Sequence, residues 1–163
     1  MSSILVAYFS ASGQTARLAR TIAQAAQADL YEIRPAQPYT ASDLNWRDPA
    51  SRSSVEMKDA ACRPPLAGEA PDLTGYDTVF VGFPIWWYQA PRIIETFLSS
   101  CDFSGRRIVP FATSGGSGLG HTEEILKKTC PAKAVFMPGR RLNSGASLGE
   151  IRNWLNGLAL DKP

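Results

Sequence analysis

Short runs of consecutive apolar residues alternate with segments of helical period along this chain of 163 residues. Continuous apolar runs are typical of strands buried on both faces of a parallel sheet. Five runs predict strands, at residues 4–9, 30–33, 78–83, 108–112 and 134–137. Between them, apolar residues four positions apart, such as Leu18, Ile22 and Ala26, predict helices. A last helix is expected after the capping box Ser147-x-x-Glu150, burying Leu148, Ile151, Leu155 and Leu158.

Strands that alternate with helices predict a parallel sheet covered on both faces, a three-layer α/β/α sandwich. We expect one domain over residues 1–163, with a five-stranded sheet of order 2-1-3-4-5. In that order the first, third and fourth strands are adjacent. Because ligands of such sheets bind at the carboxyl ends of the strands, the loops after these three strands should converge on one crevice.

The connection at residues 35–75 is the part that the pattern predicts least. It contains six of the twelve prolines, and only residues 51–61 are compatible with a helix. Connections of this length usually have a function or are partly disordered.

Composition narrows the class of protein. With 44% hydrophobic and 20% charged residues, the chain is not a disordered or fibrous protein. It has no apolar run of membrane-spanning length and no signal peptide, so we expect a soluble, cytoplasmic protein with no membrane span. Three cysteines without a CxxC motif argue against a disulfide framework, and the single histidine excludes a multi-histidine metal site. We therefore expect no metal.

The charge is close to balanced but uneven. A net charge of +2 is too weak to suggest nucleic acid as a partner. Residues 1–100 carry eight basic and ten acidic side chains, whereas residues 101–163 carry nine and five. The pairs Arg106-Arg107, Lys127-Lys128 and Arg140-Arg141 make most of this difference. Such pairs are solvated faces or a patch for an anionic partner.

The loop after the first strand, residues 10–15, is rich in hydroxyl groups and opens a helix. Its backbone N–H groups and the hydroxyls of Ser10, Ser12 and Thr15 can surround a phosphate at the positive end of the helix dipole. The loop matches neither the P-loop nor the dinucleotide glycine pattern, which disfavours triphosphate hydrolysis and a dinucleotide site. A phosphate monoester needs neither motif. The alternative is an ordinary capped turn.

The loops after the third and fourth strands have a composition that is typical of a site for a planar ring. Trp86, Trp87 and Tyr88 follow the third strand, between Pro84 and Pro91, and three consecutive large aromatics cannot all face one core. At least one is expected to stack on a planar heterocycle, unless the aromatics only plug the end of the sheet. Residues 113–120 contain four glycines, which permit close backbone approach to a ligand or form a flexible surface loop.

Together these loops resemble a known family. Ser10-Ala-Ser-Gly-Gln-Thr15 is similar to the phosphate loop of flavodoxins, T/S-x-T/S-G-x-T. Phe83-Pro-Ile-Trp-Trp87 and Thr113-Ser-Gly-Gly-Ser-Gly118 resemble the two isoalloxazine loops of a bacterial flavodoxin-like family of unassigned reductases. Two segments of the long connection are also similar to that family, Pro38-Tyr-Thr40 and Asn45-Trp46. The resemblance therefore covers essentially the whole chain. It implies a flavodoxin-like fold that binds FMN without a covalent bond.

Carried over by position, the resemblance implies three groups of FMN contacts. The phosphate would be held by Ser10, Ser12, Gly13, Gln14 and Thr15. The ring and ribityl chain would be lined by Pro84, Ile85, Trp86, Trp87 and Tyr88, with Trp87 as our first choice for stacking. Backbone groups of Thr113, Ser114, Gly115, Gly116 and Gly118 would bond the pyrimidine end. No catalytic side chain is required, and His121 is the one candidate proton donor near neutral pH, unless it is a surface or capping residue.

The function that this resemblance implies is an FMN-dependent oxidoreductase that passes electrons from NAD(P)H to a quinone-, nitro- or azo-type acceptor. Flavodoxins that carry electrons are strongly acidic, whereas this chain has a pI near 8.5, which disfavours steering toward a basic partner protein. Two alternatives stay open: a one-electron carrier that serves a redox partner protein, and a non-catalytic binding module that has lost FMN.

Overall fold

The structure is a computed structural model and describes residues 4–11, 13–87, 89–113, 122–130, 134–137 and 139–158. The strands of this part are β1 (Ile4–Tyr8), β2 (Asp29–Glu32), β3 (Thr78–Pro84), β4 (Arg107–Thr113), β5 (Val135–Phe136) and β6 (Arg140–Arg141). The helices are α1 (Gln14–Ala26), α2 (Arg52–Lys58), α3 (Arg92–Ser100), α4 (Thr122–Thr129) and α5 (Leu148–Leu158). Each predicted strand and helix is present within a few residues of its expected place.

The strands form one parallel sheet of order β2-β1-β3-β4-β5, which confirms the predicted order and the flavodoxin-like fold class. The expected fifth strand is divided into two. Phe136 pairs with Ile108, and Arg140 pairs with Phe111. Between these two pairs the outer segment therefore contains one residue more than β4 does. Between the two pairs the sequence contains Pro138, which has no N–H group to donate to a neighbouring strand.

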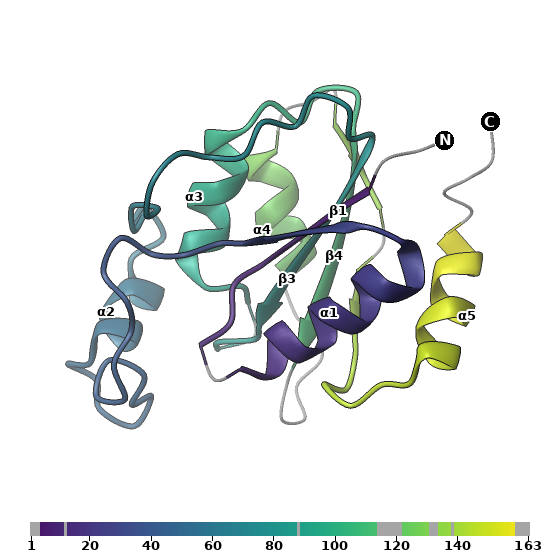
Figure 1. Ribbon diagram of the computed structural model, residues 1–163. Helices are drawn as coiled ribbons and strands as arrows, with labels where there is room; N and C mark the ends of the chain where they lie inside the picture. Colours follow the sequence, from purple (N-terminus) through teal and green to yellow (C-terminus); the bar gives the residue numbers. More distant parts are fainter. Residues whose placement is uncertain are drawn as a thin grey trace.

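Helices cover the sheet on both faces. α1 and α5 lie on one face, and α3 and α4 lie on the other (Figure 1). Alternate residues of β3 supply the two cores: Val79, Val81 and Phe83 face α3 and α4, while Phe80 faces α1 and α5. This is the period of two expected for a strand buried on both sides.

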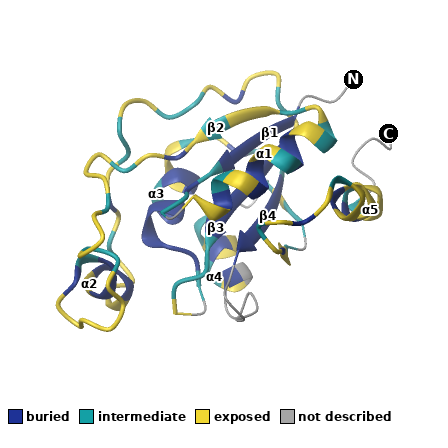
Figure 2. Cartoon of the chain, turned by 60° about the horizontal axis from the view of Figure 1, so that its bottom comes forward, coloured by how far each residue is buried: buried dark blue, intermediate teal, exposed yellow. Residues whose placement is uncertain are grey.

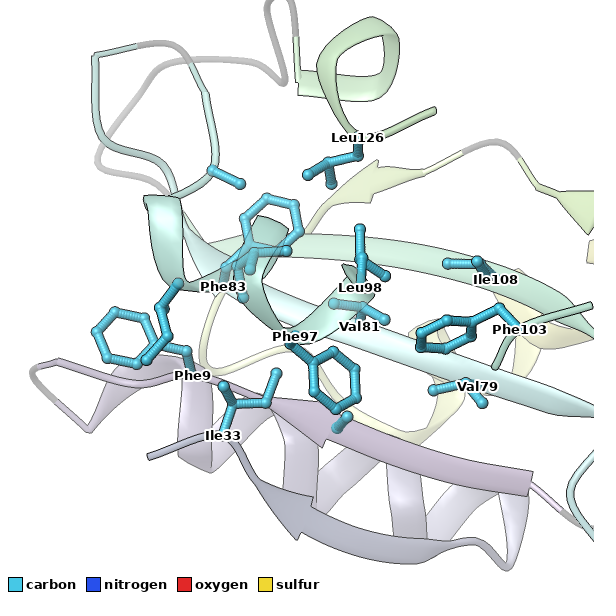
Figure 3. Close-up of a cluster of buried hydrophobic side chains, with 14 of the residues drawn as sticks. Phe9, Ile33, Val79, Val81, Phe83, Phe97, Leu98, Phe103, Ile108 and Leu126 are labelled. Carbon is cyan, nitrogen blue, oxygen red and sulfur yellow. The ribbon is translucent and has the colours of Figure 1, made fainter. Parts of the chain in front are cut away.

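The core beneath α3 and α4 is rich in phenylalanine. Phe83, Phe97 and Phe103 are fully buried there, together with Ile108 (Figure 3). Full burial of one such side chain contributes about 1.5–3 kcal/mol, so this face alone is a large part of the driving force for folding.

The last helix begins as predicted but buries a different set of residues. The Ser147 hydroxyl accepts a hydrogen bond from the Glu150 N–H at 3.2 Å, which caps α5. Ile151 is buried as expected, whereas Leu148, Leu155 and Leu158 are only half-buried. Trp154 fills the interface instead, in edge-to-face contact with Phe80 at a centroid distance of 5.6 Å. An indole covers more of the sheet than a leucine at the same position.

The long connection between β2 and β3 is ordered by contacts of its own. Its two arms pair where the N–H of Ala36 donates to the carbonyl of Pro65 and the N–H of Ala67 donates to that of Arg34. α2 lies between these arms, begins at the cap residue Ser51, and is set apart from the three layers (Figure 2). None of the described helices is long and apolar enough to cross a membrane.

Candidate functional site

Thr113, the last residue of β4, connects the ends of three strands. Its hydroxyl lies 2.7 Å from the hydroxyl of Thr15, in the first turn of α1, and its carbonyl accepts a hydrogen bond from the Ile85 N–H at 3.0 Å. Both threonines are buried, with 2% of Thr15 and 4% of Thr113 exposed. The start of α1, the residue after β3 and the end of β4 therefore meet at one point, at the edge of the sheet where the strand order predicts that they lie.

The loop after β1 provides acceptors for only some of the backbone N–H groups at the start of α1. The Ser10 hydroxyl accepts hydrogen bonds from the N–H groups of Gly13 and Ala16, both at 3.1 Å. Gly13 has a φ of 90°, a left-handed conformation that favours glycine. The N–H groups of Gln14 and Thr15 have no acceptor among the described residues, as is usual in the first turn of a helix. Backbone donors in this position, together with the helix dipole, suit an anion.

The loop after β3 turns sharply and separates its tryptophans. Trp86 and Gln89 exchange two backbone hydrogen bonds, at 2.9 and 3.1 Å, which closes a tight turn. Trp87 lies within this turn with a φ of 50° and is 42% exposed. Left-handed backbone is unfavourable for a bulky residue, so the fold holds this exposed indole at a cost of about 1–2 kcal/mol. Strain of this kind is often found at ligand sites.

Trp86 points the other way, into a cluster of aromatic rings. It contacts Phe9 and Tyr39 edge-to-face, at centroid distances of 5.8 and 5.5 Å. Phe9 and Tyr39 also contact each other, at 5.6 Å. Phe9 follows β1 and Tyr39 belongs to the long connection, so the cluster attaches that connection to the site. Trp86 thus supports the site from within, whereas Trp87 is the more exposed of the two.

Tyr39 is held by polar contacts as well. Its hydroxyl donates to the Glu56 carboxylate, and the Arg52 guanidinium lies over its ring, 3.9 Å from the centroid. Burial, and next the hydrogen bond to Glu56, raise the pKa of Tyr39 far above its usual range. The phenol is therefore protonated at all physiological pH values. Arg52 also bonds Glu56, at 2.9 Å, so α2 is joined to Tyr39 through both residues.

Arg92, at the start of α3, joins α2 to the turn at residues 86–89, which we call the tryptophan turn. Its guanidinium donates to the carbonyl of Met57 at 2.7 Å, to that of Glu56 at 3.3 Å and to the side chain of Gln89 at 3.2 Å. Glu95 pairs with it at 3.0 Å, and both side chains are almost fully buried. Gln89 ends the tryptophan turn, and Met57 lies near the end of α2. The contacts of Arg92 therefore fix the position of the tryptophan turn relative to α2.

Several of the predicted contacts lie outside the described residues: Ser12, Tyr88, Ser114, Gly115, Gly116 and Gly118, and also His121. The described members of the predicted set are Ser10, Gly13, Gln14, Thr15, Pro84, Ile85, Trp86, Trp87 and Thr113. All of these lie at the carboxyl ends of β1, β3 and β4. Pro84 pairs with Thr113 in the sheet.

The basic pairs fall at opposite ends of the sheet. Arg140 and Arg141 form β6 beside Phe111 and Ala112, near the carboxyl end of β4, and both are exposed. Arg107 begins β4, and the neighbouring Arg106 bonds the carbonyls of Leu73 and Tyr76. Arg140 and Arg141 are therefore the pair at the ligand end.

Sequence reasoning missed Phe9, Tyr39 and Arg92 as residues that support the site. A weak signal existed for Arg92. A basic side chain in the first turn of a helix opposes the helix dipole, so its presence there points to another role. Tyr39 lies in the segment Pro38-Tyr-Thr40 that contributed to the resemblance, but no local pattern predicted its partners, which lie 13 or more residues away in the sequence.

The cysteines do not take part in the site. Burial raises the pKa of Cys101, and it raises that of Cys130 to about 11, so both thiols are protonated near neutral pH. A protonated thiol is a poor nucleophile. Within the described ranges, no cluster of three or more His, Cys, Asp or Glu side chains could hold a metal ion.

A parallel sheet of order 2-1-3-4-5, with helices on both faces, defines the class of flavodoxin-like α/β proteins. The family model described as flavodoxin matches residues 3–158, and the chain belongs to this family. The comparison with curated proteins gave no match.

Three solved structures illustrate the similarity. A candidate flavoprotein from Bacteroides eggerthii is 48% identical, with a TM-score of 0.93 over 99% of this chain and 100% of that one. A second, from Bacteroides uniformis, is 50% identical, with a TM-score of 0.90 over 95% and 98%. A flavoprotein in complex with FMN from Lactobacillus acidophilus is 18% identical, with a TM-score of 0.71 over 95% and 99%, and shows the shared fold.

Proposed function

We propose that this protein is an FMN-binding flavodoxin-like oxidoreductase that moves electrons from NAD(P)H to a quinone-, nitro- or azo-type acceptor. The observation that carries the proposal is the junction at Thr113. Its contacts with Thr15 and Ile85 bring an anion-binding helix end and an aromatic turn to the same edge of the sheet. A phosphate site beside an aromatic wall suits a ligand with a phosphate at one end and a planar ring at the other.

The donor chemistry of the first loop fits a phosphate monoester. The N–H groups of Gln14 and Thr15 have no acceptor in the described part of the chain, and they lie at the positive end of α1. The Ser10 hydroxyl accepts two backbone bonds, which leaves its proton for a phosphate oxygen. The similar fold of the Lactobacillus acidophilus flavoprotein, which is described in complex with FMN, supports the same ligand.

The turn at residues 86–89 would form the wall against the ring. Trp87 is the candidate for stacking because it is exposed and its backbone is held in one conformation by the two Trp86–Gln89 bonds. Trp86 would keep this wall in place through Phe9 and Tyr39. Backbone groups of residues 113–116 and Gly118 would bond the pyrimidine end.

FMN, when bound, supplies the redox chemistry that connects a nicotinamide donor to an acceptor. The protein residues bind and orient it. The exposed pair Arg140 and Arg141 at the ligand edge favours a donor with phosphate groups, which supports NAD(P)H over a basic partner protein.

The absorption spectrum of the purified protein after incubation with FMN tests the proposal. We expect flavin bands that stay with the protein on gel filtration and that bleach when NADH or NADPH is added without oxygen. Flavin bands that neither nucleotide bleaches would assign the protein as an electron carrier. A protein that stays colourless with excess FMN would overturn the cofactor assignment and favour a binding module.

A further inference from the structure

A hollow of about 390 Å³ lies between α2 and the tryptophan turn, and Trp87 is the one lining residue to which the proposed function gives a role. It is lined by Trp46, Arg47, Pro49, Met57, Lys58 and Trp87. This volume is within the range of small-molecule sites. The long connection thus forms one side of the hollow and the turn after β3 forms the other.

The aromatic part of the lining is unusually open. Trp46 is 65% exposed and Trp87 is 42% exposed. Large aromatic side chains exposed in one place mark a ligand or partner site more often than single exposed residues do. Two indoles offer flat apolar faces, which suit a planar aromatic ligand.

The charged part of the lining has one sign only. Arg47 and Lys58 line the hollow, and no acidic side chain from the described part of the chain does. Among the described residues neither of the two forms an ion pair, and the Arg47 guanidinium instead lies 5.1 Å from the centroid of the Trp46 ring. The hollow beside the first loop differs, because Glu32 and Arg34 both line it. A cavity with unpaired cations only favours a negatively charged ligand.

Buried contacts set the distance between the two sides. Arg92 bonds the Met57 carbonyl of α2 at 2.7 Å and the Gln89 side chain of the turn at 3.2 Å. One almost fully buried guanidinium thus joins Met57 of α2 to the turn that contains Trp87. The hollow is built into the fold before any ligand arrives, which lowers the entropy cost of binding.

We propose that this hollow binds a small planar aromatic anion, such as an aromatic carboxylate or sulfonate. The rings of Trp46 and Trp87 contact its apolar faces, and Arg47 and Lys58 attract its charge. Such an anion would be a candidate electron acceptor. That role rests on the proposed function, whereas the binding of the anion does not.

A pair of redox-inert probes tests this site without any turnover. Naphthalene-2-sulfonate is an aromatic anion, and naphthalene-2-sulfonamide is its neutral match. Binding to the full chain, with and without saturating FMN, is measured by calorimetry and by the indole N–H resonances of the ¹⁵N-labelled protein. We expect the sulfonate to bind about threefold to tenfold more tightly than the sulfonamide, with the difference shrinking as salt rises. The Trp46 resonance should move, whereas that of Trp154, which lies on α5 and packs against the other face of the sheet, should not.

Two variants separate the aromatic from the electrostatic contribution. Trp46→Ala should weaken both probes by a similar factor, about threefold to tenfold. Arg47→Gln should weaken the sulfonate more than the sulfonamide, by about two- to fivefold. Arg152→Gln is the matched control, because Arg152 is an exposed cation on α5, on the other face of the sheet. It should leave both affinities unchanged.

The outcomes distinguish this site from the proposed function. Equal affinity for the two probes, or a Trp46 resonance that does not move, would overturn the inference. Loss of probe binding when FMN is added would show that the hollow is part of the FMN site, and would overturn it as well. If the chain takes no FMN but Trp46 still responds to the sulfonate, the proposed function fails and this site stands.

Discussion

At the scale of single residues, the one hydroxyl of Thr15 has two expected partners, which are the Thr113 hydroxyl and the FMN phosphate. It lies 2.7 Å from Thr113 and is 2% exposed. A hydroxyl donates one hydrogen bond and accepts two. If Thr113 donates to Thr15, the proton of Thr15 is available for a phosphate oxygen. Thr15 can therefore hold the loops together and contact the ligand at the same time.

Thr15→Ala should weaken FMN much more than riboflavin, because only FMN carries the phosphate. A charge-assisted hydrogen bond contributes about 1.5–3 kcal/mol, which is a loss of roughly tenfold or more in FMN affinity. Titrations of the two flavins by fluorescence measure this. Thr113→Val is the control, since it removes the partner of Thr15 but not the donors of the loop, and it should leave the ratio of the two affinities nearly unchanged. Equal losses for both flavins in Thr15→Ala would argue against the phosphate assignment.

Gly82 illustrates how tightly the centre of the sheet is packed. A Cβ at this position of β3 would lie 2.1 Å from a ring carbon of Phe111 on β4. Phe111 is fully buried, so its ring has no open space to move into. The glycine is required because the ring packs directly against its backbone.

Gly82→Ala should lower the free energy of unfolding by about 1–3 kcal/mol or more, as overpacked cores do. The double variant Gly82→Ala/Phe111→Leu should recover part of this loss, because the shorter side chain frees the space. Gly157→Ala serves as a control. Gly157 lies in α5 with nothing within 4 Å of an added Cβ, and its replacement should stabilise the protein by about 0.5–1 kcal/mol. Urea unfolding measures all three, and a Gly82→Ala protein as stable as the parent would contradict the packing argument.

At the scale of elements, the turn after β3 and the helix α2 depend on each other. The turn is closed by its own backbone bonds between Trp86 and Gln89. It is joined to α2 through the contacts of Arg92 and through the ring of Tyr39. Removing a buried charge such as Arg92 would leave Glu95 with one remaining partner, Arg63. The long connection is therefore part of the site's structure.

The left-handed backbone at Trp87 predicts that two substitutions which affect binding equally will differ in their effect on stability. Trp87→Ala and Trp87→Gly both remove the indole, so both should lower FMN affinity to a similar extent. The glycine variant should be more stable than the alanine variant by about 0.5–1 kcal/mol, because glycine adopts a φ of 50° without steric penalty. Thermal unfolding and FMN titration of the two variants provide the measurement. If Trp86→Ala weakens FMN and Trp87→Ala does not, the stacking residue is not Trp87.

At the scale of the whole molecule, the part of the fold that could be predicted is the part with periodic patterns. Apolar runs such as residues 78–83 mark strands that are buried on both faces, and their alternation with helices predicts a parallel sheet. The order of the strands came with the resemblance to flavodoxins. In that order the carboxyl ends of β1, β3 and β4 are neighbours, which is why the loops of unusual composition pointed to this edge of the sheet.

The contacts that support the site could not be predicted in this way. Arg92 bonds Met57 across 35 residues of sequence, and Tyr39 meets Trp86 across a connection with no periodic pattern. Such contacts depend on tertiary packing, which local periodicity does not encode. The division of the outer strand into β5 and β6 was missed for a related reason, because it depends on a one-residue difference in register against β4.

The distribution of charge over the molecule predicts which nucleotide reduces the flavin better. Arg140 and Arg141 are exposed beside the carboxyl end of β4, where the 2′-phosphate of NADPH would gain an attraction that NADH lacks. A partly exposed charge pair contributes about 0.2–1 kcal/mol, so the preference for NADPH should be modest and should shrink as salt rises. The ratio of the flavin reduction rates with NADPH and NADH, at low and high salt, measures it. Arg140→Ala/Arg141→Ala should abolish the preference.

A control for the double arginine variant removes the same amount of positive charge from another part of the molecule. Lys127 and Lys128 are exposed in the last turn of α4, a helix that follows β4 and leads away from its carboxyl end. Lys127→Ala/Lys128→Ala therefore lowers the net charge by two without changing the ligand edge, and it should keep the preference for NADPH. If both double variants lower the ratio equally, the effect comes from net charge alone. If neither changes it and salt has no effect, Arg140 and Arg141 do not contact the nucleotide, and the donor is selected by shape rather than by charge.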